Sequence, residues 1–375
     1  MSSSDSPLPL ADLKVVDAST VLAGPACARY LADFGADVIK VERPGAGDGT
    51  RTMFRAHPDD GVSYFWKLLG RGKRTVALDL KDTAADGDLA VMRRLCDEAD
   101  VLIENFRPGT LERLGLGPDV LHATNPGLVI CRVTGFGQDG PYAARAGFAT
   151  LAEAMSGYAS ISGEPDGGPL LPPIALTDEV TGLAAAFATL VAVHSGVGQV
   201  VDVNLLESLL QFMGPLVSAA AVDGYDQPRL GSGIPYTVPR GTWQCADGGW
   251  VALSTSAESV ARRVLDLVGL GDDETLRSFD GRVAARDRID AHMARWIGAR
   301  TRDEVLTAFA EAEAACAPVY SVSDVLEDPH VVARDAVVDV DGTPMQGLIA
   351  RLSATPGRIR WAGRPLDADG EAIRA

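Results

Sequence analysis

The sequence contains few cysteines and few histidines. Five of each are spread over 375 residues, and no two cysteines have the two-residue spacing of a zinc or redox motif. An odd number of widely spaced cysteines argues against a disulfide framework. The histidines also form no pair at helical spacing that could ligate a metal. We therefore expect neither structural disulfides nor a bound metal ion.

Long hydrophobic runs are absent as well. The longest nearly unbroken apolar run, residues 183–193, is shorter than the ~20 residues that a membrane-spanning helix needs. The first seven residues are rich in serine and lack the basic and apolar regions of a signal peptide. We expect a cytoplasmic protein without a membrane partner.

Basic residues are in deficit. The chain has 34 Lys and Arg against 51 Asp and Glu, a formal net charge of −17, which argues against nucleic acid as a partner. Three cations fall within four residues at Arg71-Gly-Lys-Arg74, just before a predicted strand. Such a run is either a solvated turn or a clamp on the phosphate of a small anionic molecule.

Apolar segments of strand length alternate with helical patterns in the first 135 residues. The strand candidates are residues 13–18, 37–42, 75–80, 101–104 and 128–133. This alternation predicts βαβ crossovers and a parallel sheet. The fold class is therefore α/β, with a large domain over residues 1–224.

The second half has a different pattern. Residues 225–239 are rich in glycine and proline, and a hairpin candidate follows at residues 242–254 with its turn at Asp247-Gly-Gly249. Helical patterns then run from 256 to 314. We assign residues 225–322 to a smaller α+β domain with its linkers.

Two glycine-containing loops are candidate ligand sites. Gly45-Ala-Gly47-Asp-Gly49 follows a strand but does not match GxGxxG, so we expect no nicotinamide or flavin site. Glu104-Asn-Phe-Arg-Pro-Gly109 leaves the carboxyl end of a strand, where open α/β sheets bind ligands. Asn105 offers an amide, Phe106 an apolar face and Arg107 a charge. The alternative is an ordinary polar turn.

Asp178 stands just before a long apolar helix pattern. It or Thr177 could simply cap the helix, which is common for these residue types. In the functional interpretation, the helix dipole and free backbone amides keep the Asp178 carboxylate ionised. Such a carboxylate in a dry pocket can attack a thioester as a nucleophile.

Several segments together resemble one family, the class III (CaiB/BaiF) CoA-transferases, which include formyl-CoA transferase, carnitine CoA-transferase and α-methylacyl-CoA racemase. The matching segments extend over most of the chain: 22–25, 36–44, 47–51, 73–81, 99–109, 135–141, 163–166, Asp178 with Gly182, 199–207, 242–252 and 328–331. The resemblance implies a Rossmann-like large domain and an interlocked homodimer. It also implies a C-terminal segment, residues 323–375, that returns to the large domain.

The resemblance further implies an acyl-CoA:carboxylate CoA-transferase with Asp178 as the catalytic nucleophile. Its partners would be an acyl-CoA and a free carboxylic acid. Coenzyme A would be a substrate, with no permanently bound cofactor. The residues expected to bind CoA by their position in the motifs are Val21, Ala23, Arg43, Lys73, Arg74, Asn105, Phe106 and Arg113.

Two positions depart from members of the family. The racemases use a histidine and an aspartate to move the α-proton, and the histidine belongs where this chain has Phe148. Many transferases have an acid at the position of Ala149. The alternatives to CoA transfer are therefore a racemase or epimerase with a non-standard base, or a CoA-binding protein that does not catalyse.

Overall fold

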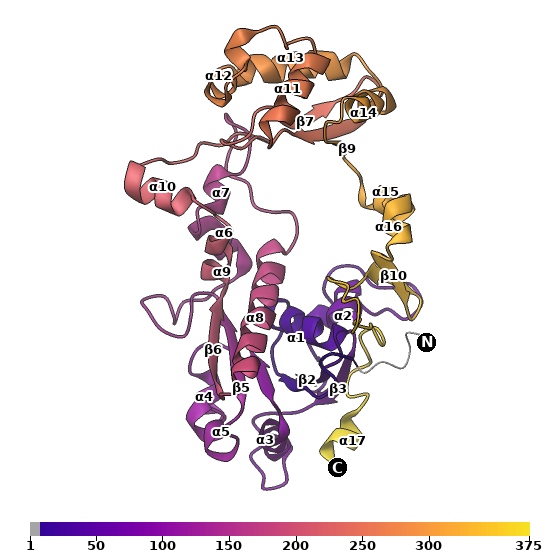
Figure 1. Ribbon diagram of the computed structural model, residues 1–375. Coiled ribbons are helices and arrows are strands. Elements are labelled where there is room, and N and C mark those ends of the chain that lie inside the picture. Colours follow the sequence, from indigo (N-terminus) through magenta and orange to yellow (C-terminus); the bar gives the residue numbers. More distant parts are fainter. Residues whose placement is uncertain (1–7) are drawn as a thin grey trace. The chain divides into compact units, whose positions relative to one another are not determined.

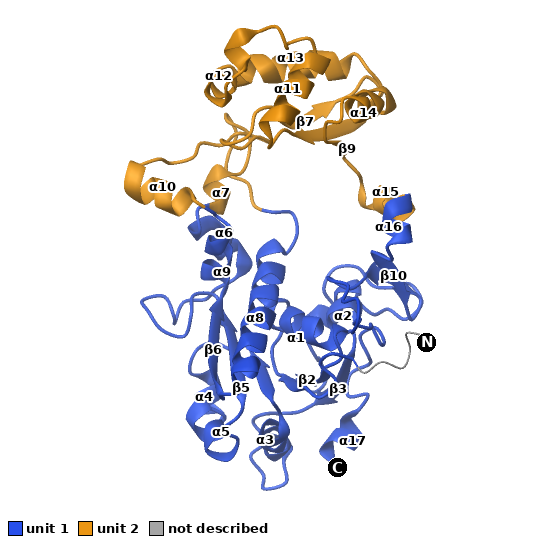
Figure 2. Ribbon diagram, viewed as in Figure 1, with its two compact units in different colours: residues 1–157, 172–214, 329–375 blue, residues 158–171, 215–328 orange. Residues whose placement is uncertain are grey.

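The computed structural model describes residues 8–375. The prediction that residues 1–7 are not part of a signal peptide concerns residues outside the described part. The chain divides into two compact units, coloured separately in Figure 2. Unit 1 comprises residues 1–157, 172–214 and 329–375, and unit 2 comprises residues 158–171 and 215–328.

Unit 1 is built on a six-stranded parallel sheet, as the strand and helix alternation predicts. Its strands are β1 (Lys14–Asp17), β2 (Asp37–Glu42), β3 (Lys73–Ala77), β4 (Val101–Glu104), β5 (Val129–Thr134) and β6 (Gln199–Asn204), in the order β3-β2-β1-β4-β5-β6. The central strands are buried on both faces, which explains their continuous apolar sequences. The strand order reverses between β1 and β4. A doubly wound sheet opens a crevice for ligands at the carboxyl ends of two such strands.

Helices cover both faces of this sheet (Figure 1). On one face, α1 (Ala23–Asp33) and α8 (Leu176–Ser195) pack against Val15, Val38, Ile103 and Cys131. On the other face lie α3 (Asp88–Glu98), α4 (Thr110–Arg113) and α5 (Pro118–Thr124). By length and composition α8 could also cross a membrane, but its Ala185, Thr189 and Ala192 are buried in unit 1.

The C-terminal segment closes the edge of the sheet at β3. The backbone N–H groups of Thr75 and Ala77 donate to the carboxylates of Asp369 (2.9 Å) and Asp367 (2.8 Å). The Thr75 carbonyl accepts from the Asp369 N–H. The remaining elements of unit 1 are η1 (Gly49–Arg51), α2 (Tyr64–Leu69), α6 (Ala149–Met155), α9 (Leu205–Gln211), α16 (Pro329–Ala333), β10 (Val337–Val340), β11 (Thr343–Gln346) and α17 (Gly370–Arg374).

Unit 2 contains a three-stranded antiparallel sheet, β7 (Arg240–Gln244), β8 (Trp250–Ser254) and β9 (Cys316–Pro318). The predicted hairpin is present, with Gly248 in the left-handed region (φ 83°). Trp243 and Val251 form its core with Ile289 and Phe309. The other elements are α7 (Tyr158–Ile161), α10 (Leu216–Asp223), α11 (Glu258–Leu267), η2 (Glu274–Leu276), α12 (Phe279–Ala284), α13 (Arg286–Gly298), α14 (Arg302–Glu311) and α15 (Val322–Glu327).

Candidate active site

Asp178 lies in the first turn of α8 but does not cap the helix. The helix begins at Leu176, and its N-cap is Ala175, which makes no side-chain cap. The Thr177 hydroxyl donates instead to Glu153 Oε1 on α6, at 2.8 Å. Within residues 8–375, no group donates a hydrogen bond to the Asp178 carboxylate. The interpretation of Thr177 or Asp178 as an N-cap is therefore wrong.

The surroundings of Asp178 disfavour its negative charge. Burial, together with the nearby carboxylates of Glu153 and Glu179, raises the pKa of Asp178 to about 6. At pH 7 about nine-tenths of such a group is still ionised. The site thus holds a half-buried carboxylate of raised basicity, and among the described residues no backbone amide donates to it as the functional interpretation expected.

The two neighbouring acids have different partners. The Glu179 carboxylate accepts hydrogen bonds from Arg29 Nη2 (2.8 Å) and the Tyr30 hydroxyl (3.0 Å), both on α1. Glu153 is only 4% exposed. Glu153 was not among the predicted site residues, although a lone acid between the apolar residues of α6 was a signal for it.

A close contact at Gly182, four residues after Asp178, joins α8 to the start of α1. A Cβ atom on Gly182 would lie 2.7 Å from Ala26 Cβ and 2.9 Å from the Ala23 carbonyl oxygen. Only glycine allows α8 to approach α1 this closely. Asp178 is one turn earlier on the same face of α8, because residues four apart lie above one another.

The predicted loops after β1 and β4 meet at the reversal of strand order. Asn105 Oδ1 accepts from the Thr20 N–H and Asn105 Nδ2 donates to the Thr20 carbonyl, both at 2.7 Å. This pairing brings Val21, in the turn, and Ala23, the first residue of α1, to the loop that carries Phe106. Four of the predicted CoA-binding residues therefore share one edge of unit 1.

Two other predicted CoA-binding residues are exposed. Arg43 directly follows β2. Arg113 ends α4, and its guanidinium donates to the Thr110 hydroxyl at 2.7 Å. Both follow strands whose carboxyl ends point toward the edge that carries Asn105.

The cations at positions 71–74 require a correction. Lys73 is fully buried, and its ammonium donates to Asp17 Oδ2 and the Pro25 carbonyl, both at 2.8 Å. Arg74 lies at the start of β3, away from the carboxyl ends, and pairs with Asp37. Arg71 pairs with Asp33. These side chains serve internal ion pairs, which argues against the phosphate clamp and against a direct contact of the buried Lys73 with CoA.

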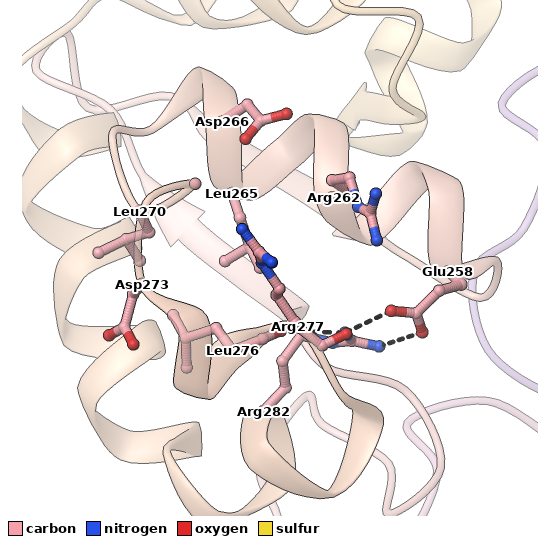
Figure 3. A pocket seen from close by; sticks show the side chains of 10 residues that line it. Glu258, Arg262, Leu265, Asp266, Leu270, Asp273, Leu276, Arg277 and Arg282 are labelled. Carbon is pink, nitrogen blue, oxygen red and sulfur yellow. Dashed lines mark hydrogen bonds and ion pairs between the residues drawn. The ribbon is translucent and has the colours of Figure 1, made fainter.

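A pocket of about 320 Å³ lies within unit 2 and contains none of the residues discussed above (Figure 3). Its Arg282 forms a two-pronged ion pair with Glu258, at 2.8 and 2.7 Å. Three arginines in its lining are balanced by three acids, so the pocket has no charge preference that would indicate a ligand.

The described residues include no cluster of three His, Cys, Asp or Glu side chains suited to a metal ion. All five cysteines are free thiols.

Comparisons with known proteins agree with the resemblance. Residues 10–369 match the model of CoA-transferase family III. The chain is 37% identical to succinyl-CoA–D-citramalate CoA-transferase of Chloroflexus aurantiacus, covering 98% of this chain and 93% of that protein. It is 34% identical to succinate–glutarate CoA-transferase of Agrobacterium fabrum, covering 97% and 93%.

Solved structures show the same fold. A CaiB/BaiF family protein from Brucella suis superposes with a TM-score of 0.87 at 32% identity, over 98% of this chain and 99% of that one. Together with the family match and the identity to curated CoA-transferases, this shows that the chain belongs to CoA-transferase family III, the CaiB/BaiF family.

Proposed function

We propose that this enzyme transfers CoA from succinyl-CoA to another dicarboxylic acid through a covalent intermediate on Asp178. The observation that carries the mechanism is the half-buried Asp178 carboxylate, which accepts no hydrogen bond within residues 8–375 and whose pKa is raised to about 6 by burial, Glu153 and Glu179. The names of several relatives support the donor, since they use succinyl-CoA with D-citramalate, L-malate or glutarate. No resident cofactor is needed for this exchange.

The exchange proceeds in two mirrored halves. An oxygen of Asp178 attacks the thioester carbonyl, the C–S bond breaks, and CoA thiolate leaves a mixed anhydride. The thiolate then attacks the Asp178 side-chain carbonyl and expels the donor acid, which leaves an aspartyl-CoA thioester. The acceptor carboxylate attacks that thioester and releases the thiolate. The thiolate takes the acceptor's acyl group, and Asp178 returns as a carboxylate.

The electrostatics around Asp178 favour the first of these steps. Acylation converts the carboxylate into a neutral anhydride, which removes one negative charge from beside Glu153 and Glu179. Basicity raised by burial also makes the carboxylate a better nucleophile at neutral pH.

Covalent trapping tests the proposal. The enzyme is incubated with succinyl-CoA, acetyl-CoA or propionyl-CoA, then treated with hydroxylamine and digested for peptide mass analysis. We expect an aspartyl hydroxamate at Asp178, formed fastest with succinyl-CoA. If no acyl-CoA modifies Asp178 while CoA still binds, the chain is a non-catalytic binder or a racemase. Deuterium uptake into 2-methylacyl-CoA would identify the racemase.

Activity should fall below pH 6. Only the carboxylate form of Asp178 attacks, so kcat/KM should decrease about tenfold per pH unit below its pKa. Glu153→Gln keeps the acceptor for the Thr177 hydroxyl but removes one neighbouring charge. It should therefore lower the pKa of Asp178, so that the decrease in kcat/KM begins at a lower pH. Rates from pH 4.5 to 8 measure the shift, with Glu98→Gln on the exposed end of α3 as control. If the pH profile of Glu153→Gln matched that of the wild type, Glu153 would not contribute to the raised pKa of Asp178.

We also propose that the active form is a homodimer. Leu183, Phe187 and Val191 form an apolar stripe at four-residue spacing on α8, and they are 42%, 70% and 53% exposed. Contiguous apolar surface of this kind is typical of interfaces, and the family resemblance implies a second copy. Light scattering should give a dimer for the wild type and a monomer for Phe187→Asp. Val120→Asp, on an equally exposed part of α5, should remain dimeric. A monomeric wild type would contradict the proposal.

A further inference from the structure

Side chains bind the backbone of the β1–α1 turn, residues 19–21. The Ser19 N–H donates to Asp17 Oδ1 (3.1 Å), and the Ser19 carbonyl accepts from Lys40 Nζ. The Thr20 N–H and carbonyl are both paired with Asn105. The Val21 N–H donates to Asp48 Oδ2 at 3.2 Å. The turn is therefore shaped by residues that are distant in the sequence.

Val21 shows why such support is needed. Its φ of 67° lies in the left-handed region, which a β-branched residue rarely adopts. The next residues open α1, whose first turn contacts α8 at Gly182, one turn after Asp178. If Val21 relaxed to an ordinary conformation, the start of α1 would change direction.

Asp48 is held rigidly enough to impose this conformation. It is 3% exposed, and its Oδ1 accepts from the Thr50 N–H (2.9 Å) and the Thr50 hydroxyl (2.7 Å). Its own N–H donates to Glu42 Oε2 at 2.9 Å. Arg51 forms a two-pronged pair with Glu42, at 2.7 Å on each side, which fixes that acceptor in turn.

Lys40 supplies the matching positive charge. Its ammonium lies 3.4 Å from Asp48 Oδ2 and 3.6 Å from Asp17 Oδ1, with 1% of its side chain exposed. Burial alone would lower the pKa of Lys40, but Asp17 and Asp48 raise it above its ordinary value. One buried cation thus joins the two carboxylates that hold the two ends of the turn.

We propose that Asp48 and Lys40 are positioning residues that hold Val21 in its left-handed conformation and so preorganise the β1–α1 turn for CoA. This inference rests on the proposed function, because the turn is taken to contact the CoA substrate. The two residues act through the turn rather than by touching the reacting atoms.

The test compares the full-length enzyme with Asp48→Asn and Asp48→Glu. Asparagine removes the charge that faces Lys40. Glutamate keeps the charge but displaces the acceptor from the Val21 N–H. For both variants we expect the Kd of CoA, measured by calorimetry, and the KM of succinyl-CoA to rise about tenfold, with kcat nearly unchanged. A purely structural role would instead reduce the folded, active fraction, which lowers apparent kcat and leaves KM unchanged.

Two further variants serve as a control and as a second test of the inference. Asp82→Asn is the matched control, because Asp82 also accepts from loop N–H groups in unit 1, and it should leave Kd and KM at wild-type values. In the double variant Val21→Gly/Asp48→Asn, the Kd of CoA should equal that of Val21→Gly alone, since glycine adopts positive φ without support from Asp48. Wild-type Kd in both Asp48 variants, or a double variant that binds CoA much more weakly than Val21→Gly, would overturn the inference.

Failure of the positioning role can be distinguished from failure of the proposed function. If the proposed function fails, the wild-type enzyme forms no hydroxamate at Asp178. If only the positioning role fails, the wild type is trapped, and the Asp48 variants bind CoA as tightly as the wild type does.

Discussion

Asp178→Asn should abolish CoA transfer, lowering kcat by about 10³-fold or more. The amide cannot form the anhydride or the aspartyl thioester, so every covalent step is lost, and removing a nucleophile is among the most damaging active-site substitutions. Folding should be preserved, because the Asp178 side chain accepts no hydrogen bond within residues 8–375. Its raised pKa also means that the folded chain disfavours the charge, so the melting temperature should stay constant or rise at pH 7.

The measurement is the rate of acceptor-CoA formation by chromatography, together with a thermal melt. Asp119→Asn is a matched control, since Asp119 is also an acid in the first turn of a helix but is exposed on α5. We expect it to retain full activity. If Asp178→Asn kept more than about a tenth of the wild-type rate, covalent catalysis at this residue would be refuted.

Arg71→Ala should destabilise the protein by about 3–5 kcal/mol, the usual cost of breaking a buried ion pair by removing one partner. Arg71 and Asp33 each have 1% of the side chain exposed, and Nε and Nη2 bind the two Asp33 oxygens at 2.9 and 2.6 Å. Nη1 also donates to the Gln346 carbonyl at 2.5 Å, so the substitution also releases part of the C-terminal segment. Burial already raises the pKa of Asp33, which would be left without its partner.

Chemical denaturation at pH 7 measures this effect. The control is Arg74→Ala, three residues further on, whose pair with Asp37 is about one third exposed. An exposed pair of this kind contributes less than about 1 kcal/mol. Equal losses of stability in the two variants would show that burial does not govern the strength of these pairs.

The sheet was predictable because its strands are apolar runs separated by helical patterns, and these properties are local. The role of the two cations at the start of β3 was not predictable. Lys73 and Arg74 look like the cations of a turn, but the structure pairs them with Asp17 and Asp37, more than thirty residues away. The acids that neutralise them come from β1 and β2, and no pattern along the chain marks those partners.

The candidate site shows the same limit. Asp178 could be selected by its place before an apolar helix and by the family motifs. The environment of Asp178 could not be predicted, since Glu153 lies on another helix. Its carboxylate accepts the hydrogen bond of the Thr177 hydroxyl, which was expected to cap α8. The support of Val21 was equally hidden, because Asp17, Lys40, Asp48 and Asn105 come together only when the sheet has formed.

The C-terminal segment that closes the free edge of β3 has a consequence for folding during synthesis. The groups that satisfy the free edge of β3 belong to Asp367 and Asp369, which follow Ala77 and Thr75 by 290 and 294 residues. Ile373, which is buried in the same core as Val76, belongs to the same late segment. The nascent chain must therefore carry an open sheet edge while the residues between are made. Such an edge invites pairing with other chains during this interval.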